Sequence, residues 1–154
     1  MYIKVKVIPD AKKEKFEQKS EELFEISVKE KAKQKIRECD TLVDALIGYH
    51  LQGNPRGNFK EVIKAMNDSE KKIISYDVPS GIDATTGRCF EPCIRASSTL
   101  SLAMPKKLFE TKEGRHASGE IFVADIGIPD FLYNMISPGS RPRFEDFTFS
   151  LAVL

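Results

Sequence analysis

The sequence has almost no net charge, no long apolar run and few cysteines, and each absence excludes a class of protein. Its 24 lysines and arginines nearly balance its 23 aspartates and glutamates, whereas a dedicated nucleic-acid binder carries excess basic residues. No apolar stretch approaches the roughly 20 residues of a membrane span, and the first residues show no signal-peptide pattern. Three cysteines fit a reducing compartment better than a disulfide scaffold. We therefore expect a cytoplasmic globular protein that binds neither nucleic acid nor membranes.

The 154 residues suffice for one compact domain preceded by a charged segment. Residues 1–38 interleave both signs of charge, which is typical of a solvated face rather than a binding patch. Alternation over residues 3–7 and an apolar run at residues 23–28 predict two strands, and residues 29–38 read as a short polar helix. The remaining chain divides into a main domain over residues 39–136 and a tail over residues 137–154.

The main domain begins with a strand–helix–strand pattern. Residues 41–47 and 72–78 are nearly continuous apolar runs, and apolar residues recur at helical spacing over residues 59–66. Asn58, with a glutamate three residues later, is predicted to cap this helix. Such a unit implies two parallel strands joined by a right-handed crossover, and therefore an α/β fold. Further strands are predicted at residues 97–103 and 120–126.

Oxygen-bearing side chains occur where these strands end. Asp44 interrupts the first apolar run and Asp77 closes the second, followed by Ser80 in a Pro-Ser-Gly turn. An unpaired buried carboxylate is costly, so Asp44 needs a cation, a cluster of donors or a proton. Two carboxylates, a hydroxyl and main-chain carbonyls suit a hard cation better than zinc or copper. Ser80 is a poor candidate nucleophile because its surroundings are not G-x-S-x-G and no histidine is placed to serve it.

The turn over residues 48–57 (GYHLQGNPRG) precedes the predicted helix and has features of an anion-binding loop. It lacks the G-K-S/T ending of a P-loop and is not G-x-G-x-x-G, so an ordinary connecting turn remains the alternative. Arg56 and His50 are its candidate anion contacts. Cys89 and Cys93 lie four residues apart without a second pair, which argues against a zinc site.

Four strings, in this order and spacing, resemble one family. They are VDALIG at residues 43–48, YDVPSGIDATTG at residues 76–87, MPKK at residues 104–107 and GEIFVADIGIP at residues 119–129. Together they are similar to the NAD(P)H-hydrate epimerases, the YjeF amino-terminal domain family, over residues 39–129.

The resemblance implies a Rossmann-like three-layer sandwich with a mostly parallel sheet. It implies epimerisation of the R and S forms of NADHX and NADPHX, the hydrated nicotinamide cofactors, with a dehydratase as a pathway partner. Asp44 and Ser80 would ligate a potassium ion, and Asp77 would move a proton at the reacting ring. The implied substrate contacts are Gly48, Tyr49, His50, Leu51, Gln52, Gly53, Asn54, Asp77 and Lys106.

The sequence also departs from the family pattern. The N-N-G-G-D loop, which would supply another potassium ligand and much of the phosphate cradle, does not occur in the chain. Elements expected ahead of residue 43 are mostly missing, and Phe59 stands where the family commonly has tyrosine. We therefore expect a sheet that is incomplete on its N-terminal side, with an open edge that favours a homodimer. A non-catalytic nucleotide-binding or scaffold module is the alternative function.

Overall fold

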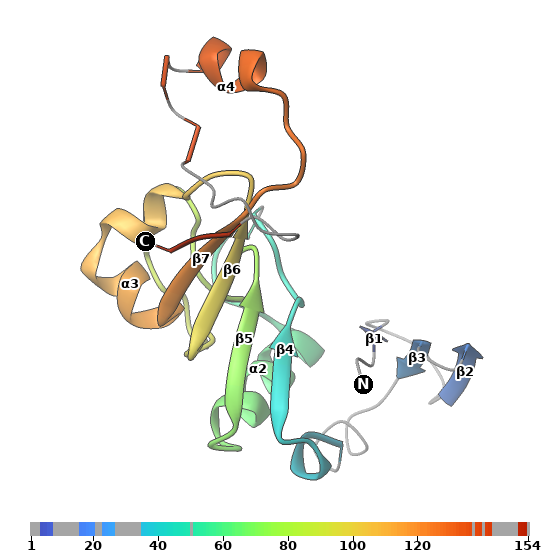
Figure 1. The fold of residues 1–154 in the computed structure, drawn as a ribbon. Helices are drawn as coiled ribbons and strands as arrows, with labels where there is room; N and C mark the ends of the chain where they lie inside the picture. Colours follow the sequence, from blue (N-terminus) through green and yellow to red (C-terminus); the bar gives the residue numbers. More distant parts are fainter. Residues whose placement is uncertain are drawn as a thin grey trace.

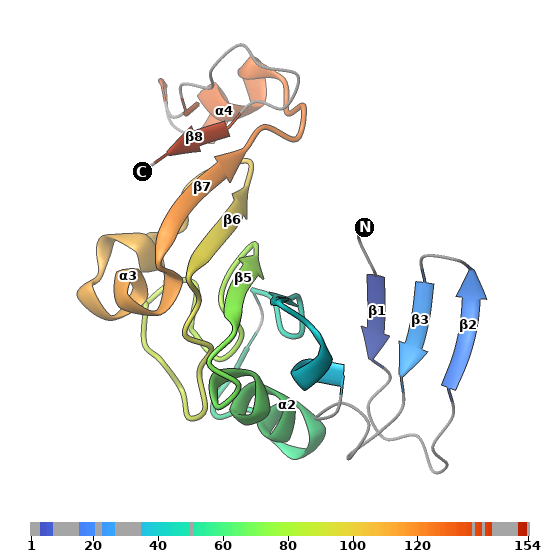
Figure 2. The same ribbon diagram turned by 60° about the horizontal axis from the view of Figure 1, so that its bottom comes forward.

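The computed structural model contains two β-sheets (Figures 1 and 2). Strand order is β1-β3-β2 in the first sheet and β4-β5-β6-β7-β8 in the second. The residues that the structure describes are 4–7, 16–20, 23–26, 35–49, 51–136, 138–139, 141–142 and 151–153.

The three-stranded sheet lies in the charged N-terminal segment. β1 (Lys4–Val7) pairs in parallel with β3 (Leu23–Ile26), which confirms the two strands expected there. β2 (Phe16–Ser20) pairs antiparallel to β3 and was not predicted, because its polar sequence FEQKS shows no apolar alternation. Of the predicted helix over residues 29–38, residues 35–38 are helical and residues 29–34 lie outside the described residues.

The five-stranded sheet is parallel except for its last strand. β4 (Thr41–Asp44), β5 (Lys72–Tyr76), β6 (Ser98–Leu102) and β7 (Glu120–Ala124) follow one another in chain order and pair in parallel. β8 (Leu151–Val153) adds an antiparallel strand to β7, so the C-terminal tail contributes to the sheet. The predicted parallel pairing of the first two strands of the main domain is confirmed.

Helices cover one face of this sheet. Buried residues alternate with more exposed ones along β4 to β7. α2 (Gly57–Asn67) packs on the buried face at β4 and β5, and η1 (Lys107–Glu110) with α3 (Lys112–Ser118) packs at β7. The opposite face exposes 64% of Val43 and 50% of Tyr76. The described residues thus supply the sheet and one helical layer of a mostly parallel α/β fold.

α2 begins differently from the expectation. Arg56 is the N-cap residue, in an extended conformation, and Gly57 follows with φ +55°. The predicted cap at Asn58 is wrong because the chain breaks from extended to helical geometry at Arg56 and Gly57, which leaves Asn58 inside the first turn.

α4 (Asp130–Ile136) lies beyond the carboxyl end of β7 and projects from the sheet in both views (Figures 1 and 2). Tyr133 is buried and donates its hydroxyl hydrogen to the Ala103 carbonyl at 3.0 Å. This bond fixes α4 to the loop after β6. Among the described residues, no helix is long and apolar enough to cross a membrane.

Candidate functional site

Asp44, the last residue of β4, is a fully buried carboxylate surrounded by hydrogen-bond donors. One carboxylate oxygen accepts from the Ser80 hydroxyl at 2.6 Å and from the Leu46 N–H at 3.4 Å. The other accepts from the Ser80 N–H at 2.7 Å and from the Ser75 hydroxyl at 2.9 Å. These four donors compensate the desolvation of a side chain with 0% exposure. Of the three kinds of compensation that the sequence left open for Asp44, the structure shows the cluster of donors.

These bonds also explain why the strands end earlier than the apolar runs predict. The Ile47 N–H donates to the Ser80 hydroxyl oxygen at 2.8 Å, and the Leu46 N–H turns toward Asp44. Both amide groups therefore leave the sheet ladder, so β4 ends at Asp44 rather than at residue 47.

Burial and hydrogen bonding shift the pKa of the Asp44 carboxyl in opposite directions. Burial raises the pKa of this carboxyl above its usual value, and the bonds from Ser80, Ser75 and Leu46 partly offset that rise. The carboxyl is held as an acceptor inside the turn, without direct access to solvent. It therefore suits a structural or cation-holding role better than proton transfer to a bound molecule.

Asp77 follows β5 and adopts a left-handed backbone conformation, with φ +69°. Its carboxylate lies 2.9 Å from the Lys106 Nζ and accepts the Leu102 N–H at 3.2 Å. Lys106 also donates to the carbonyls of Leu102 at 2.8 Å and Met104 at 3.3 Å. A non-glycine residue in this conformation is uncommon and often marks a functional site. Lys106 thus positions Asp77, and its expected contact with a substrate anion stays a prediction.

The three oxygen-bearing residues predicted from the sequence lie at one edge of the sheet, but their side chains point in two different directions. Asp44 and Ser80 are in direct contact. Asp77 instead points toward the loop after β6, and 24% of its side chain is exposed. The structure therefore separates a buried Asp44–Ser80 pair from an accessible Asp77–Lys106 pair.

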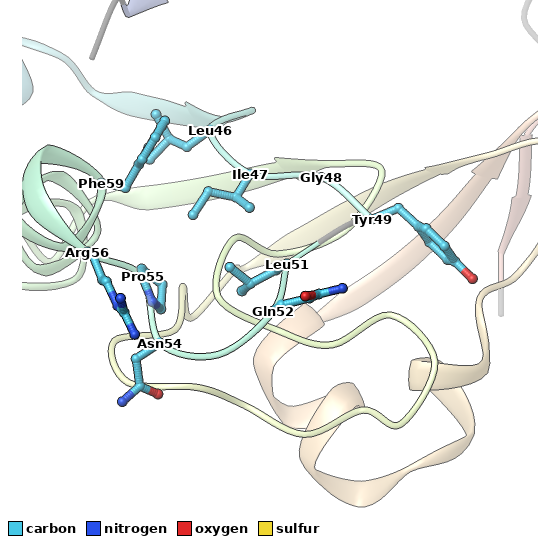
Figure 3. A pocket seen from close by; sticks show the side chains of 10 residues that line it. All are labelled: Leu46, Ile47, Gly48, Tyr49, Leu51, Gln52, Asn54, Pro55, Arg56 and Phe59. Carbon is cyan, nitrogen blue, oxygen red and sulfur yellow. The ribbon is translucent and has the colours of Figure 1, made fainter. Parts of the chain in front are cut away.

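A pocket of about 650 Å³ lies beside the predicted binding turn (Figure 3). Leu46, Pro55 and Phe59 gather at the α2 end, and Tyr49 lies at the other end. Asp77, Lys106 and Gly53 are not among the lining residues, and His50 lies outside the described residues. The complete lining is Leu46, Ile47, Gly48, Tyr49, Leu51, Gln52, Asn54, Pro55, Arg56 and Phe59.

Two contacts tie the pocket turn to the loop that follows β5. The Tyr49 hydroxyl lies 3.4 Å from the Thr85 hydroxyl. The Asn54 side-chain oxygen accepts the Glu91 N–H at 3.1 Å. The turn is therefore anchored at both ends to the segment that carries Ser80.

The amino end of α2 forms part of the pocket and has unusual electrostatics. Its N-cap is Arg56, no side chain caps its first N–H groups, and its first turn contains no acidic residue. Helix amino ends normally carry an oxygen-bearing cap or an acid, because both interact well with the exposed N–H groups and the helix dipole. A positive side chain beside uncapped N–H groups favours an anionic ligand at this place.

Three oxygen-bearing groups meet in the Asp44 cluster, where the sequence predicts a hard cation. The Asp44 carboxylate, the Ser80 hydroxyl and the Ile47 carbonyl meet at the Ser80 oxygen, which lies 2.6 Å from the Asp44 oxygen and 3.2 Å from the Ile47 oxygen. Oxygen ligands of this kind fit an alkali or alkaline-earth cation and do not fit a soft metal. Within the described ranges, no group of three or more histidine, cysteine, aspartate or glutamate residues is placed to hold a metal.

Sequence reasoning missed Ser75, one of the three residues that donate hydrogen bonds to Asp44. Ser75 lies opposite Asp44 in the parallel register of β4 and β5. The available signal was a serine inside the apolar run IISY, but only the register shows that it faces the carboxylate. Thr85 was missed as well, because its contact with Tyr49 depends on the path of two loops.

Comparisons with known proteins place the chain among related sequences. The family model described as YjeF-related protein N-terminus matches residues 5–108. An NAD(P)H-hydrate epimerase of Dehalogenimonas lykanthroporepellens is 43% identical over 62% of this chain, and one of Weissella koreensis is 42% identical over 60%. A bifunctional NAD(P)H-hydrate repair enzyme Nnr of Moorella thermoacetica is 40% identical over 61% of this chain. The chain spans 38%, 42% and 18% of these three relatives, respectively.

A solved structure shares the fold. The crystal structure of yeast ynu0 (YNL200c) superposes with a TM-score of 0.69 and 23% sequence identity, covering 86% of this chain and 54% of the yeast chain. The family model accounts for more than half of the residues, and the solved structure supports the α/β architecture. This chain therefore belongs to the family of YjeF-related protein N-termini.

Proposed function

We propose that this chain binds hydrated nicotinamide dinucleotides at the carboxyl ends of β4 and β5 and epimerises the R and S forms of NADHX and NADPHX. The names of the relatives support this reaction class. In open parallel sheets, ligands bind outside the carboxyl ends of the strands. The pocket, Asp77 and the Asp44 cluster all occur at that edge.

The observation that carries the proposal is the pocket at the amino end of α2. A dinucleotide brings a pyrophosphate, and Arg56 with the uncapped N–H groups of α2 supplies complementary charge. Leu46, Ile47 and Phe59 add apolar surface, and Tyr49, Gln52 and Asn54 add polar groups. Such a mixture of apolar walls and few polar groups is typical of a small-molecule site.

Asp77 is the residue that we propose for proton transfer. It is the partly exposed carboxylate at this edge, whereas Asp44 is fully buried. Lys106 and the Leu102 N–H fix its orientation, and general acid–base catalysis requires such positioning. In this scheme Asp77 donates a proton to the ring hydroxyl as the ring carbon–oxygen bond breaks, so that water leaves and the ring nitrogen lone pair stabilises the cationic carbon. Asp77 then takes a proton back from the water that adds to either face of the ring and re-forms the bond.

Potassium is the proposed cation at the Asp44 cluster. Asp44 and Ser80 would hold it, and it would supply positive charge beside the pocket turn and the substrate phosphates. The chain itself contributes the buried carboxylate and the Ser80 hydroxyl that orients the Ile47 N–H.

The alternative is a nucleotide-binding or scaffold module without turnover. One observation favours it: the described residues leave one face of the main sheet exposed at Val43 and Tyr76. A dehydratase partner and a homodimer also remain proposals.

The experiment follows the equilibration of purified NADPHX epimers by chromatography, with potassium present. The wild-type chain should exceed the buffer rate, and Asp77→Asn should lower the enzymatic rate by at least about 100-fold. Asp40→Asn, at an exposed position before β4, is the matched control and should retain activity.

A thermal melt with NADPHX separates the alternatives. A raised Tm without turnover would support the binding module and contradict the epimerase. No change in Tm together with a rate equal to buffer would contradict both functions.

A further inference from the structure

Cys89 and Cys93 bring two thiols together in the loop between β5 and β6. The Cys93 Sγ lies 3.2 Å from the Cys89 Sγ, and its thiol hydrogen points at that sulfur or at the Ile94 carbonyl oxygen 3.5 Å away. Both residues are free cysteines of intermediate exposure. Neither cysteine takes part in the proposed nucleotide site, so that site does not explain why the two thiols lie together.

The surrounding backbone holds the two cysteines in this arrangement. The Phe90 N–H donates to the Gly81 carbonyl and the Ile94 N–H to the Ser80 carbonyl, each at 2.8 Å. The Cys89 N–H donates to the Glu113 carboxylate at 3.1 Å, and the Cys93 carbonyl accepts from the Asn67 side chain at 2.8 Å. The loop is therefore fixed on both sides of the pair, and the thiols meet without a rearrangement of the fold.

We propose that Cys89 and Cys93 form a redox-active dithiol that a hydroperoxide oxidises to an intramolecular disulfide. The Cys89 thiolate attacks the peroxide oxygen, the oxygen–oxygen bond breaks, and Cys89 becomes a sulfenic acid. Cys93 then loses its proton and attacks the Cys89 sulfur, a water molecule leaves, and the sulfur–sulfur bond forms. The two sulfurs lose two electrons, which reduce the peroxide to water or to water and an alcohol.

The pKa values of the two thiols are shifted in opposite directions, as this order of attack requires. The thiol hydrogen bond from Cys93 lowers the pKa of Cys89, against smaller opposing effects of burial and Glu113. The same bond and burial raise the pKa of Cys93. Thiolates are the nucleophiles in such reactions, so Cys89 is the attacking sulfur and Cys93 the resolving one.

Oxidation would reach the candidate site through backbone contacts. A disulfide shortens the distance between the sulfurs from 3.2 Å to about 2.05 Å. The loop is bonded to the carbonyls of Ser80 and Gly81, so this contraction acts on the turn that carries Ser80. The chemistry of the dithiol itself does not depend on the proposed epimerase activity.

Trypsin offers a direct test, because cleavage after Arg88 and Arg95 releases residues 89–95 with both cysteines. The folded chain is treated with hydrogen peroxide, remaining thiols are alkylated without reduction, and the peptide is weighed. We expect the unalkylated peptide to lose the mass of two hydrogen atoms and to regain it with dithiothreitol. Cys39→Ser, which removes the exposed third cysteine, should behave like the wild type.

Two variants and one condition make the test decisive. Cys89→Ser should slow peroxide consumption about tenfold, and Cys93→Ser should leave Cys89 free to gain two oxygen atoms as a sulfinic acid. Unfolding in urea should slow disulfide formation, because the contact is then lost. A wild-type peptide that remains alkylated at both sulfurs, or a rate unchanged in urea, would overturn the proposal.

Discussion

Asp44 shows how a single residue connects the sequence to the site. A carboxylate inside the apolar run TLVDALI had to be compensated, and the structure places four donors around it. The need for compensation was predictable from desolvation alone. The identity of its partners was only partly predictable, since Ser80 follows a recognisable turn whereas Ser75 depends on strand register.

We predict that Asp44→Asn lowers the free energy of unfolding by about 3 kcal/mol. The amide NH₂ replaces one acceptor oxygen, and either orientation of the amide sets it against the N–H of Leu46 or Ser80. Urea unfolding followed by circular dichroism measures the change. Asp40→Asn, at an exposed position, should change stability by less than about 0.5 kcal/mol, and equal stability of the two variants would contradict this account.

Asp83 should make stability depend on pH in the acid range. The N–H groups of Thr86 and Thr85 both donate to one Asp83 oxygen at 2.8 Å, and these bonds lower the pKa of the carboxyl. The stabilisation is therefore fully present above the ordinary value of about 3.9 and is lost as pH falls through the lower folded value.

Asp83→Asn keeps an acceptor oxygen but does not titrate. The wild type should have a higher free energy of unfolding than this variant, and the difference should be larger at pH 7 than near pH 3. Urea titrations at both pH values measure it, and an advantage that grows toward acid would contradict the assignment.

The turn after β5 is the element on which the site depends. The apolar run over residues 72–78 predicted the strand, but β5 ends at Tyr76 because Asp77 turns into a left-handed conformation. The helix over residues 59–66 was predicted from the helical spacing of its apolar residues. Its first residue was misplaced because the chain changes from extended to helical geometry at Arg56 and Gly57. Periodicity locates elements well, whereas their ends depend on hydrogen bonds made by residues distant in sequence.

Gly81→Ala should destabilise the chain by about 3 kcal/mol. Gly81 has φ +97°, and an added Cβ would lie 2.5 Å from the Pro92 carbonyl oxygen and 2.6 Å from the Cys93 Cα. Gly127→Ala is the control, because Gly127 has φ +78° with nothing within 4 Å of the added Cβ. Thermal and urea unfolding should show a loss of only about 1 kcal/mol there. Equal losses would show that the close packing at Gly81 is unimportant.

Arg56→Ser should stabilise α2 and weaken anion binding at the same time. Serine supplies the missing cap, worth about 1 kcal/mol, and removes the positive charge that favours a phosphate. Urea unfolding measures the first effect, and the rise in Tm with inorganic pyrophosphate measures the second. Lys64→Ala, in the last turn of α2, should leave the pyrophosphate response unchanged. A larger response in Arg56→Ser would contradict the anion site.

At the scale of the whole molecule, the α/β class and the parallel pairing of the first two strands were predictable from the strand–helix–strand pattern, whereas the mostly parallel sheet was implied by the family resemblance. β8 was not, because a short antiparallel strand at the end of the tail has no strong local pattern. The exposed face at Val43 and Tyr76 agrees with the expected incompleteness of the fold. β4 ends the five-stranded order, and the homodimer expected from an open edge stays a prediction for light scattering.

Hydrogen exchange with and without NADPHX tests most directly whether the strand ends form a dinucleotide site. Bound nucleotide should slow amide exchange over residues 46–49, 51–59 and 77–82, with little change in α4 (Asp130–Ile136). Slower exchange confined to other segments, or no change at a concentration that raises the Tm, would contradict the assignment of the pocket beside α2 as the nucleotide site.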